Sequence, residues 1–294
     1  MADTQSITDV LDRSGWTHTS SLALLDLDVT VYSDEPEVVL LVQELFAPLA
    51  TTRPAQRVLS MGSATVEDRP GYCVALDGVV IARTTAPSVA FTHLLFDTNR
   101  LAIENAVGPV VLHAAGAVAG DIAIALPGPM DAGKSTLVAG LVANGLSYLT
   151  DELVAIDSAT THCRPYAKAI SLGVSPDELA RLRWDAPGQW VEYLAMSGLV
   201  PVRSIRSDVV ATATKLGLVV LPRYESSAST EVTRLDLSDA LMSVAAHAFH
   251  LERPGTLRAL SDALEGIPCY RLVSGHLDEA VAAVLDLADT SARV

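Results

Sequence analysis

The sequence predicts an α/β protein of two domains, a small α+β domain in residues 1–105 and a larger α/β domain in residues 106–294. The chain has 294 residues and half of them are apolar, which is enough for two domains of ordinary size. The pattern changes near Pro109. Short strand patterns divided by turn residues precede this point, and strand, glycine-rich turn and helix patterns follow it.

The first domain begins after a polar leader, residues 1–20, that lacks the apolar core of a signal peptide. Alternating apolar residues predict one half-buried strand at Leu22–Tyr32. Pro36 marks the first turn of a helix that continues through Val38–Leu49. The other elements predicted here are strands at Arg57–Ser60, Gly71–Ala75 and Val79–Ala82 and a helix at Ser88–Ala106. None carries a catalytic motif, so we expect this domain to present a substrate or contact a partner.

The second domain opens with two strand patterns, Val110–Val118 and Asp121–Leu126. A helix pattern then ends at Asn144, and Gly145 stands where a left-handed C-cap occurs. The next pattern, Leu146–Ile156, predicts one continuous strand. Further along, the sequence predicts strands at Leu216–Leu221 and Tyr270–Leu272 and helices at Leu237–Leu251, Thr256–Leu264 and Leu277–Leu287.

The composition argues against two classes of partner. The formal net charge is −15 and the isoelectric point is about 4.7, so the surface repels nucleic acid and anionic membranes. No apolar run is long enough to span a bilayer. Cys73, Cys163 and Cys269 are scattered and match no metal spacing, so we expect buried thiols. We expect a soluble, cytoplasmic protein with neither nucleic acid nor membrane as a partner.

One stretch matches a phosphate-binding loop in every fixed position. Gly128-Pro-Met-Asp-Ala-Gly133-Lys134-Ser135 has the form G-x-x-x-x-G-K-[ST] and lies between a predicted strand and a predicted helix. Backbone N–H groups of such a loop and the helix N-terminus bind phosphate oxygens. Lys134 is placed to reach the outer phosphates, and Ser135 to ligate Mg²⁺. The residues expected to bind Mg-ATP are Gly128, Pro129, Met130, Asp131, Ala132, Gly133, Lys134, Ser135 and Thr136.

Asp131 is unusual in this loop because its carboxylate should repel phosphate. An Asp adopts glycine-like backbone geometry more readily than most residues, so the loop can keep its shape. Two alternatives remain: the charge weakens ATP binding, or the side chain points away.

Two further signals flank the loop. Asp151-Glu152 follows the apolar stretch Leu146–Leu149, with only one helix between the acidic pair and the loop. A kinase uses one carboxylate for the metal and often another to take the proton of the attacking hydroxyl. His113 lies on the strand before the one that leads into the loop.

The stretch Val111–Asp157 resembles the catalytic core of the HPr serine kinase/phosphorylase family. In that family a histidine on a strand hairpin precedes the loop, and an acidic pair follows one helix later. His113, Gly128–Ser135 and Asp151–Glu152 have this order with similar gaps. The resemblance covers about residues 106–290 and implies a P-loop kinase domain of the HPr kinase/PEP carboxykinase type.

Three later strings resemble a branch of the family found beside peptide natural-product genes, in which some members phosphorylate serine in a ribosomally made peptide. The strings are Pro165-Tyr-Ala-Lys-Ala-Ile-Ser-Leu172, Leu221-Pro-Arg-Tyr224 and Ile267-Pro-Cys-Tyr-Arg271. Residues 1–105 match only loosely, and to this branch.

The resemblance also implies a role for each residue. Lys134 and Ser135 hold phosphate and Mg²⁺. Asp151 is the general base and a metal ligand and Glu152 a metal or neighbouring ligand, with the two roles interchangeable, while His113 steers or charges the acidic pair. Lys168 and Arg223 are further candidates for phosphate contact.

The chain departs from the family in several places. Met130 and Asp131 replace small residues and a glycine, and the family's usual Asp-Asp pair is here Asp151-Glu152. The glycine-rich segment that HPr kinase uses around its protein substrate is missing, so we do not expect HPr as the substrate.

Three functions remain open. The leading one is a Mg-ATP-dependent kinase acting on a hydroxyl, of serine in a peptide or protein or of a small metabolite. The second is a nucleotide-binding regulator without turnover, and the third is phosphorolysis or ATP hydrolysis. HPr kinases are ring-like oligomers, but the N-terminal half of this chain differs, so the ring is not carried over and a small homo-oligomer is the expected assembly.

Overall fold

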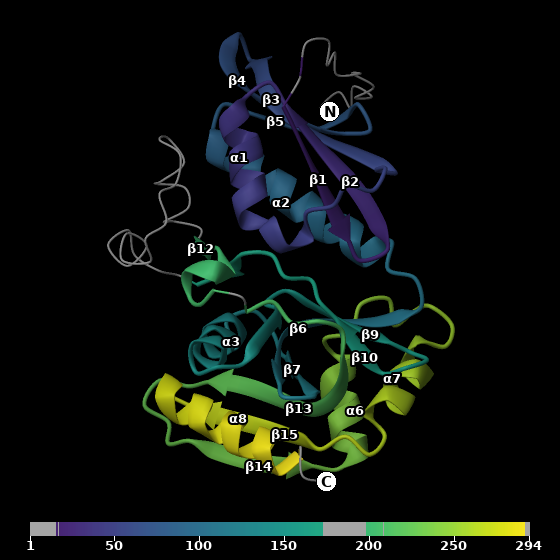
Figure 1. The fold of residues 1–294 in the computed structure, drawn as a ribbon, viewed down its shortest axis with the longest axis vertical. Helices are drawn as coiled ribbons and strands as arrows, with labels where there is room; N and C mark the ends of the chain where they lie inside the picture. Colours follow the sequence, from purple (N-terminus) through teal and green to yellow (C-terminus); the bar gives the residue numbers. More distant parts are fainter. Residues whose placement is uncertain (1–15, 17, 173–197, 208, 292–294) are drawn as a thin grey trace, which may run out of the picture. The chain divides into compact units, whose positions relative to one another are not determined.

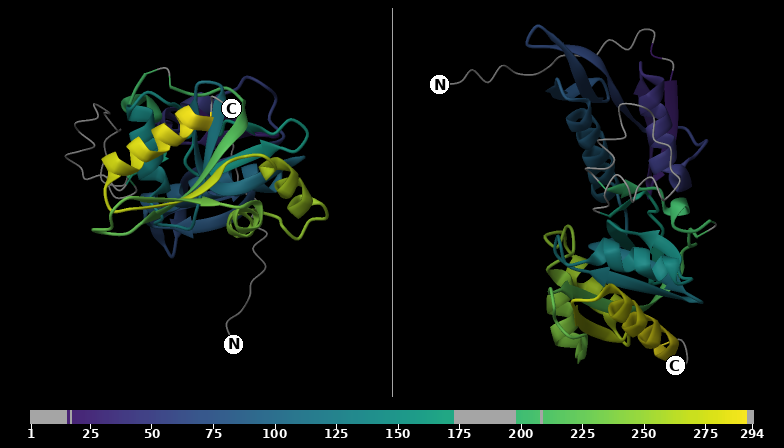
Figure 2. Two further views of the ribbon diagram at one scale, coloured as in Figure 1. Left: turned by 90° about the horizontal axis from the view of Figure 1, so that it is seen from below. Right: turned by 90° about the vertical axis from the view of Figure 1, so that its left-hand side faces the viewer.

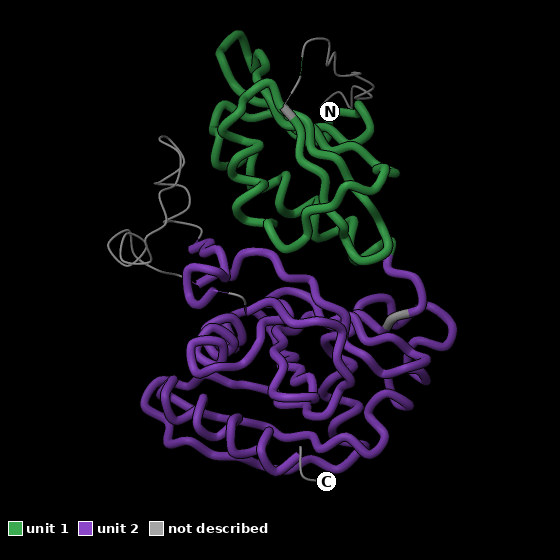
Figure 3. The backbone as a smooth tube through the Cα atoms, viewed as in Figure 1, with its two compact units in different colours: residues 1–105, 185–196 green, residues 106–184, 197–294 purple. Residues whose placement is uncertain are grey.

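The computed structural model describes residues 16, 18–172, 198–207 and 209–291, which form two compact units. The described residues up to Asn105 belong to unit 1, and those from Ala106 onward belong to unit 2 (Figure 3). Among the described residues, no helix combines the length and apolar character needed to cross a bilayer.

Unit 1 is a five-stranded sheet with two helices packed on it. The strand order is β1-β2-β3-β4-β5, and all neighbours are antiparallel except β2 and β3. Helix α1 joins the parallel pair, as such a crossover requires. The elements are β1 (His18–Leu24), β2 (Leu27–Ser33), α1 (Pro36–Leu45), a 3₁₀ turn (Ala47–Leu49), β3 (Arg57–Val66), β4 (Arg69–Leu76), β5 (Val79–Thr84) and α2 (Pro87–Glu104).

The single strand predicted at Leu22–Tyr32 is wrong, because β1 and β2 form a tight hairpin there. The chain reverses at Leu25, whose φ of 59° lies in the left-handed region, and Leu24 pairs with Leu27. Strand β1 also extends back into the predicted leader, to His18. The rest of that leader, residues 1–15 and 17, lies outside the described residues.

Unit 2 contains an eight-stranded mixed sheet. Strand β7 (Ile122–Pro127) lies beside β6 (Pro109–Ala119), which is antiparallel to it, and β13 (Thr214–Tyr224), which is parallel. Strand β15 (Cys269–Ser274) adds in parallel to β13, and β14 (Glu231–Leu235) forms the edge. On the other side, β6 pairs with both β8 (Ser147–Thr150) and β9 (Leu153–Asp157).

Short strands complete the unit. Strand β10 (His162–Arg164) pairs with β9 and also with the start of β13. Strands β9, β6, β7, β13 and β10 therefore form a closed circuit of hydrogen-bonded strands. Strands β11 (Ile170–Ser171) and β12 (Leu199–Val200) form a separate two-stranded pair.

Helices cover both faces of the large sheet (Figures 1 and 2). Helices α3 (Lys134–Ala143) and α8 (Leu277–Ser291) pack over one face, with Ile124 and Leu126 of β7 in their core. Helices α6 (Leu237–Ala245) and α7 (Thr256–Leu264) pack over the other, with Ala123 and Ala125. The alternation along β7 thus gives a strand buried on both faces, as expected between two helical layers.

Two predictions for this unit are wrong. The continuous strand predicted at Leu146–Ile156 is divided into β8 and β9 by Asp151 and Glu152. The helix predicted at Leu237–Leu251 ends at Ala245. Strands β10, β11, β12 and β14 carry no strong sequence signal and were not predicted.

Candidate functional site: a phosphate loop beside a charged cluster

The Gly128–Ser135 segment forms a loop between the end of β7 and the start of α3. Gly133 is the helix N-cap at a φ of 87°, and no side chain caps the helix. Asp131 has a φ of 62°, so it adopts the glycine-like geometry expected of it. A Cβ on Gly128 would lie 3.2 Å from the Ala132 Cβ. A side chain at Gly128 would therefore be tightly packed against the loop. The loop leaves the N-terminal amides of α3 without a side-chain acceptor.

Lys134, the lysine of the motif, is held across the loop. Its Nζ donates to the Pro129 carbonyl at 2.7 Å and lies 3.1 Å from Nε2 of His113. An ammonium group only donates, so Nε2 accepts and the proton of a neutral imidazole is on Nδ1. The sequence places these two residues far apart, and the pairing of β6 with β7 brings them together.

The acidic pair occupies the turn between β8 and β9. The Thr150 hydroxyl accepts hydrogen bonds from the N–H groups of Glu152 and Leu153, at 3.1 and 3.2 Å. A serine or threonine hydroxyl that binds amides two and three residues on stabilises such a turn. The Glu152 carbonyl in turn accepts from the Ala114 N–H, so the turn is fixed against the strand that carries His113.

The side chain of Asp151 is buried, with only 1 % of it exposed, and both its oxygens have partners. Oδ1 accepts from Lys168 Nζ at 2.9 Å and from the Tyr148 hydroxyl at 3.1 Å. Oδ2 accepts from the Ser171 N–H at 2.7 Å. Asp151 therefore does not point into solvent, but these hydrogen bonds occupy its oxygens.

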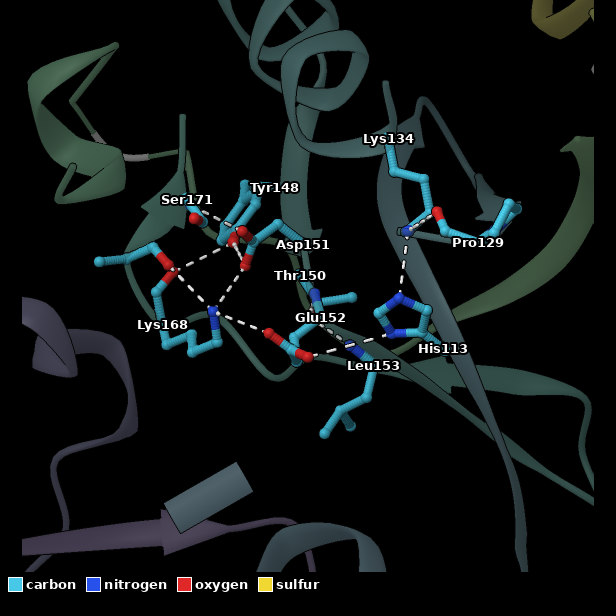
Figure 4. Close-up of polar contacts among 11 residues, drawn as sticks. His113, Pro129, Lys134, Tyr148, Thr150, Asp151, Glu152, Leu153, Lys168 and Ser171 are labelled. Carbon is cyan, nitrogen blue, oxygen red and sulfur yellow. Dashed lines mark hydrogen bonds and ion pairs between the residues drawn. The ribbon is translucent and has the colours of Figure 1, made fainter. Parts of the chain in front are cut away.

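Glu152 connects this buried cluster to the phosphate loop (Figure 4). One carboxylate oxygen lies 3.5 Å from Lys168 Nζ, and the other lies 3.9 Å from Nδ1 of His113. About a third of the side chain is exposed. A continuous line of charged and polar groups thus runs from Lys134 through His113 and Glu152 to Lys168 and Asp151, and Glu152 is the accessible carboxylate in it.

Burial and neighbouring charges shift several pKa values along this line. Burial, and then the Lys134 charge, lower the pKa of His113, which agrees with a neutral ring. Burial lowers the pKa of Lys134 despite the nearby carboxylates. Burial alone would lower the pKa of Lys168, but Asp151 and then Glu152 outweigh it, so its pKa lies above the ordinary value.

The structure gives the two weaker phosphate candidates different surroundings. The Lys168 ammonium group contacts Asp151, Glu152 and the Ala169 carbonyl and not the loop. Arg223 is 70 % exposed at the end of β13 and forms an ion pair with Glu225 at 2.6 Å. It lines two pockets next to the loop.

Two of the three residues predicted for Mg²⁺, Ser135 and Glu152, fit that ion through oxygen chemistry, whereas the oxygens of Asp151 are occupied. Among the residues that the structure describes, no three His, Cys, Asp or Glu side chains gather as a metal site. Mg²⁺ bound with a nucleotide takes only one or two protein ligands beside phosphates and waters. The Ser135 hydroxyl on the first turn of α3 and the accessible carboxylate of Glu152 are ligands of that kind.

Sequence reasoning missed Tyr148, Thr150 and Ser171. Thr150 could be recognised from the sequence. It directly precedes Asp151 and Glu152, and a threonine hydroxyl that accepts from the N–H two residues later is typical of a turn. Tyr148 and the Ser171 N–H meet Asp151 only through the tertiary fold, and no local pattern indicates them.

Comparisons with known proteins give likeness only to solved structures. No protein-family model matches the chain, and no curated protein matches it either. A solved structure that it resembles is the Hpr(Ser) kinase/phosphatase from Coxiella burnetii, at 12 % sequence identity and a TM-score of 0.33. The match covers 62 % of this chain and 95 % of that one. A likeness this distant assigns neither a family nor an activity.

Proposed function

We propose that unit 2 is a Mg-ATP-dependent phosphotransferase that moves the γ-phosphoryl group to a hydroxyl. The observation that carries the proposal is the phosphate loop between strand and helix, with Lys134 joined through His113 to the accessible carboxylate of Glu152. A loop of this form binds phosphate through main-chain amides. A carboxylate beside it supplies what phosphoryl transfer needs besides positioning, namely a metal ligand or a proton acceptor.

The geometry favours a division of roles between the two acids. Glu152 faces His113 and is accessible, so it takes the proton of the attacking hydroxyl or ligates the metal. Asp151, with its oxygens occupied by Lys168, Tyr148 and Ser171, holds the turn in place. This exchanges the roles first expected from the sequence. Bound Mg²⁺, with Ser135 as a ligand, supplies charge neutralisation at the phosphates.

We propose the acceptor as a chemical class, a hydroxyl-bearing molecule. Transfer breaks the bond between the γ-phosphorus and its bridging oxygen and forms a bond to the hydroxyl oxygen of the acceptor, whose proton leaves to the base. We propose a serine hydroxyl in a peptide or protein, of the kind modified in peptide natural products, or the hydroxyl of a small metabolite.

The test measures binding and transfer separately. Purified protein is incubated with γ-labelled ATP, Mg²⁺ and pools of serine peptides and small alcohols, and nucleotide affinity is measured by calorimetry. Lys134→Ala should weaken ATP binding. Glu152→Gln should retain ATP but lose about 10²–10⁴-fold in transfer rate, the usual contribution of a general base.

Glu231→Gln is the matched control, since it removes an exposed carboxylate from β14. It should leave both quantities unchanged. Transfer by Glu152→Gln at the wild-type rate would show that Glu152 is not the base, and a wild-type protein that binds no nucleotide would refute the whole proposal.

A second candidate is a nucleotide-binding regulator without turnover. Asp131 favours it, because an acidic side chain in the loop repels phosphate. Asp151 also favours it, because its oxygens are hydrogen-bonded within the protein and are not available for catalysis. Tight ATP binding with no label on any acceptor would support this candidate. Phosphorolysis would be recognised by pyrophosphate release from a phosphorylated acceptor and inorganic phosphate.

A further inference from the structure

A pocket of about 440 Å³ lies beside the phosphate loop in unit 2. Its floor and walls come from the loop and first turn of α3, the ends of β13 and β15, and the start of α8. Its lining is mainly apolar and includes Leu137, Pro222, Tyr224, Leu272, Leu277 and Ala280. A volume of this size, lined in this way, is typical of small-molecule sites.

The topology places this pocket where a ligand is expected. Strands β7, β13 and β15 are parallel neighbours (Figure 1). Their carboxyl ends therefore meet at one edge of the sheet, the edge that carries the phosphate loop. In α/β proteins, both with open sheets and with closed barrels, ligands bind outside the carboxyl ends of the parallel strands.

Tyr224 joins the pocket to the loop. Its N–H donates to the Ala132 carbonyl at 3.2 Å, and a Cβ built on Gly133 would lie 3.4 Å from the Tyr224 Cβ. The aromatic side chain is 58 % exposed and lines the pocket. A ring held this close to the loop can stack on a flat group attached to phosphates bound there.

Three polar residues of the lining do not favour an anion. Arg223 pairs with Glu225. The Ser274 Oγ is hydrogen-bonded to Thr230 Oγ1 at 2.8 Å and to the His276 backbone. Asp131 adds a negative charge. The pocket thus suits an uncharged aromatic group better than a second phosphate.

We propose that this pocket receives the nucleoside end of the nucleotide, with the base packed between Tyr224 and the apolar residues of α8. The inference rests on the proposed function and assigns one part of its substrate. The nucleoside then lies against α8, while the loop's other side, at Lys134 and His113, is left for the terminal phosphate and the acceptor.

The test compares ATP with inorganic tripolyphosphate, which can use only the loop. Calorimetry on the full-length protein with Mg²⁺ should show that ATP binds the wild type more tightly than tripolyphosphate. Tyr224→Ser should weaken ATP binding by about tenfold or more, the range of base–aromatic stacking. It should leave the affinity for tripolyphosphate unchanged. Tyr224→Phe, which keeps the ring, should bind ATP like the wild type.

Leu277→Ala tests the opposite wall of the pocket independently. It should weaken the binding of ATP but not the binding of tripolyphosphate. The inference fails if ATP and tripolyphosphate bind the wild type equally, or if both Tyr224→Ser and Leu277→Ala leave ATP affinity unchanged. If the wild type binds neither compound, the proposed function fails and this inference fails with it. Binding of tripolyphosphate without ATP would refute both proposals, whereas equal binding of the two compounds would contradict only the nucleoside pocket.

Discussion

At the scale of single residues, the site depends on charges that are compensated inside the protein. Lys168 and Asp151 are both nearly inaccessible, with 7 % and 1 % of their side chains exposed, and their charged atoms are 2.9 Å apart. Removing two such charges from water is costly, and each is tolerated because the other is present. Glu152 lies at the edge of this pair, between Lys168 and His113.

Replacing Lys168 by Met should therefore destabilise the protein strongly. The variant leaves the Asp151 carboxylate buried without its cation, and breaking a buried pair in this way costs about 3–5 kcal/mol. Urea unfolding at pH 7.5 measures the difference. Surface ion pairs contribute roughly 1 kcal/mol or less to the free energy of unfolding. A smaller loss than this would show that Lys168 does not compensate a buried Asp151 charge.

The pH dependence gives this prediction a second readout. The pKa of Lys168 is raised above 10.5 in the folded state. Its contribution to stability is therefore complete below that pH and is lost as the pH rises through the raised value. The stabilities of the wild type and Lys168→Met should converge only in that alkaline range. The double variant Asp151→Asn/Lys168→Met should recover part of the loss at neutral pH.

At the scale of elements, the phosphate loop is supported by a close contact between α3 and α8. Gly140, on α3, has no side chain, and a Cβ built there would lie 2.7 Å from Val281 Cγ2 and 3.3 Å from Leu277 Cδ1. Glycine inside a helix normally costs stability relative to alanine. Here it is used because it lets the two helices approach each other.

Gly140→Ala should accordingly destabilise the protein by about 1–3 kcal/mol, the cost of overpacking a core, although alanine is the better helix former. Thermal or urea unfolding measures it. Val281→Ala opens space at the same point, so the double variant should be more stable than the sum of the single changes predicts. Simple additivity of the two changes would show that α3 and α8 do not meet at Gly140.

The same scale shows which elements a sequence can predict. The phosphate loop is predicted because its geometry is local: the motif itself contains Asp131 and Gly133, the two residues with positive φ. The break in the strand predicted at Leu22–Tyr32 is not, because the apolar alternation continues through Leu25. Leu25 is an unusual residue for a left-handed turn. In the turn after β8, the Thr150 hydroxyl is the one turn-forming hydroxyl that the sequence offers.

At the scale of the whole molecule, the chain divides its residues between two units, and the candidate site belongs to one of them. Lys134, His113, the acidic turn and the pocket beside the loop are all in the unit that begins at Ala106. How their elements pair could not be predicted, because β7 pairs with a strand much later in the sequence. Lys168 has no periodic signal that relates it to Asp151.

A protein of residues 106–294 alone should therefore bind nucleotide. Its affinity should be within about threefold of the full-length value, since every residue assigned to nucleotide binding is retained. Calorimetry with Mg-ATP, together with circular dichroism to confirm folding, checks this. A folded fragment with no affinity for ATP would show that residues 1–105 complete the binding site.

The parallel pairing of β7 with β13 also affects how the protein is made. The ribosome delivers β7 and the phosphate loop first, and it must add all the residues up to Thr214 before the partner strand exists. Until then, one edge of β7 exposes unpaired backbone groups next to apolar side chains, a surface that invites aggregation. We expect a nascent chain stalled before Thr214 to bind holdase chaperones and to release them once β13 has emerged.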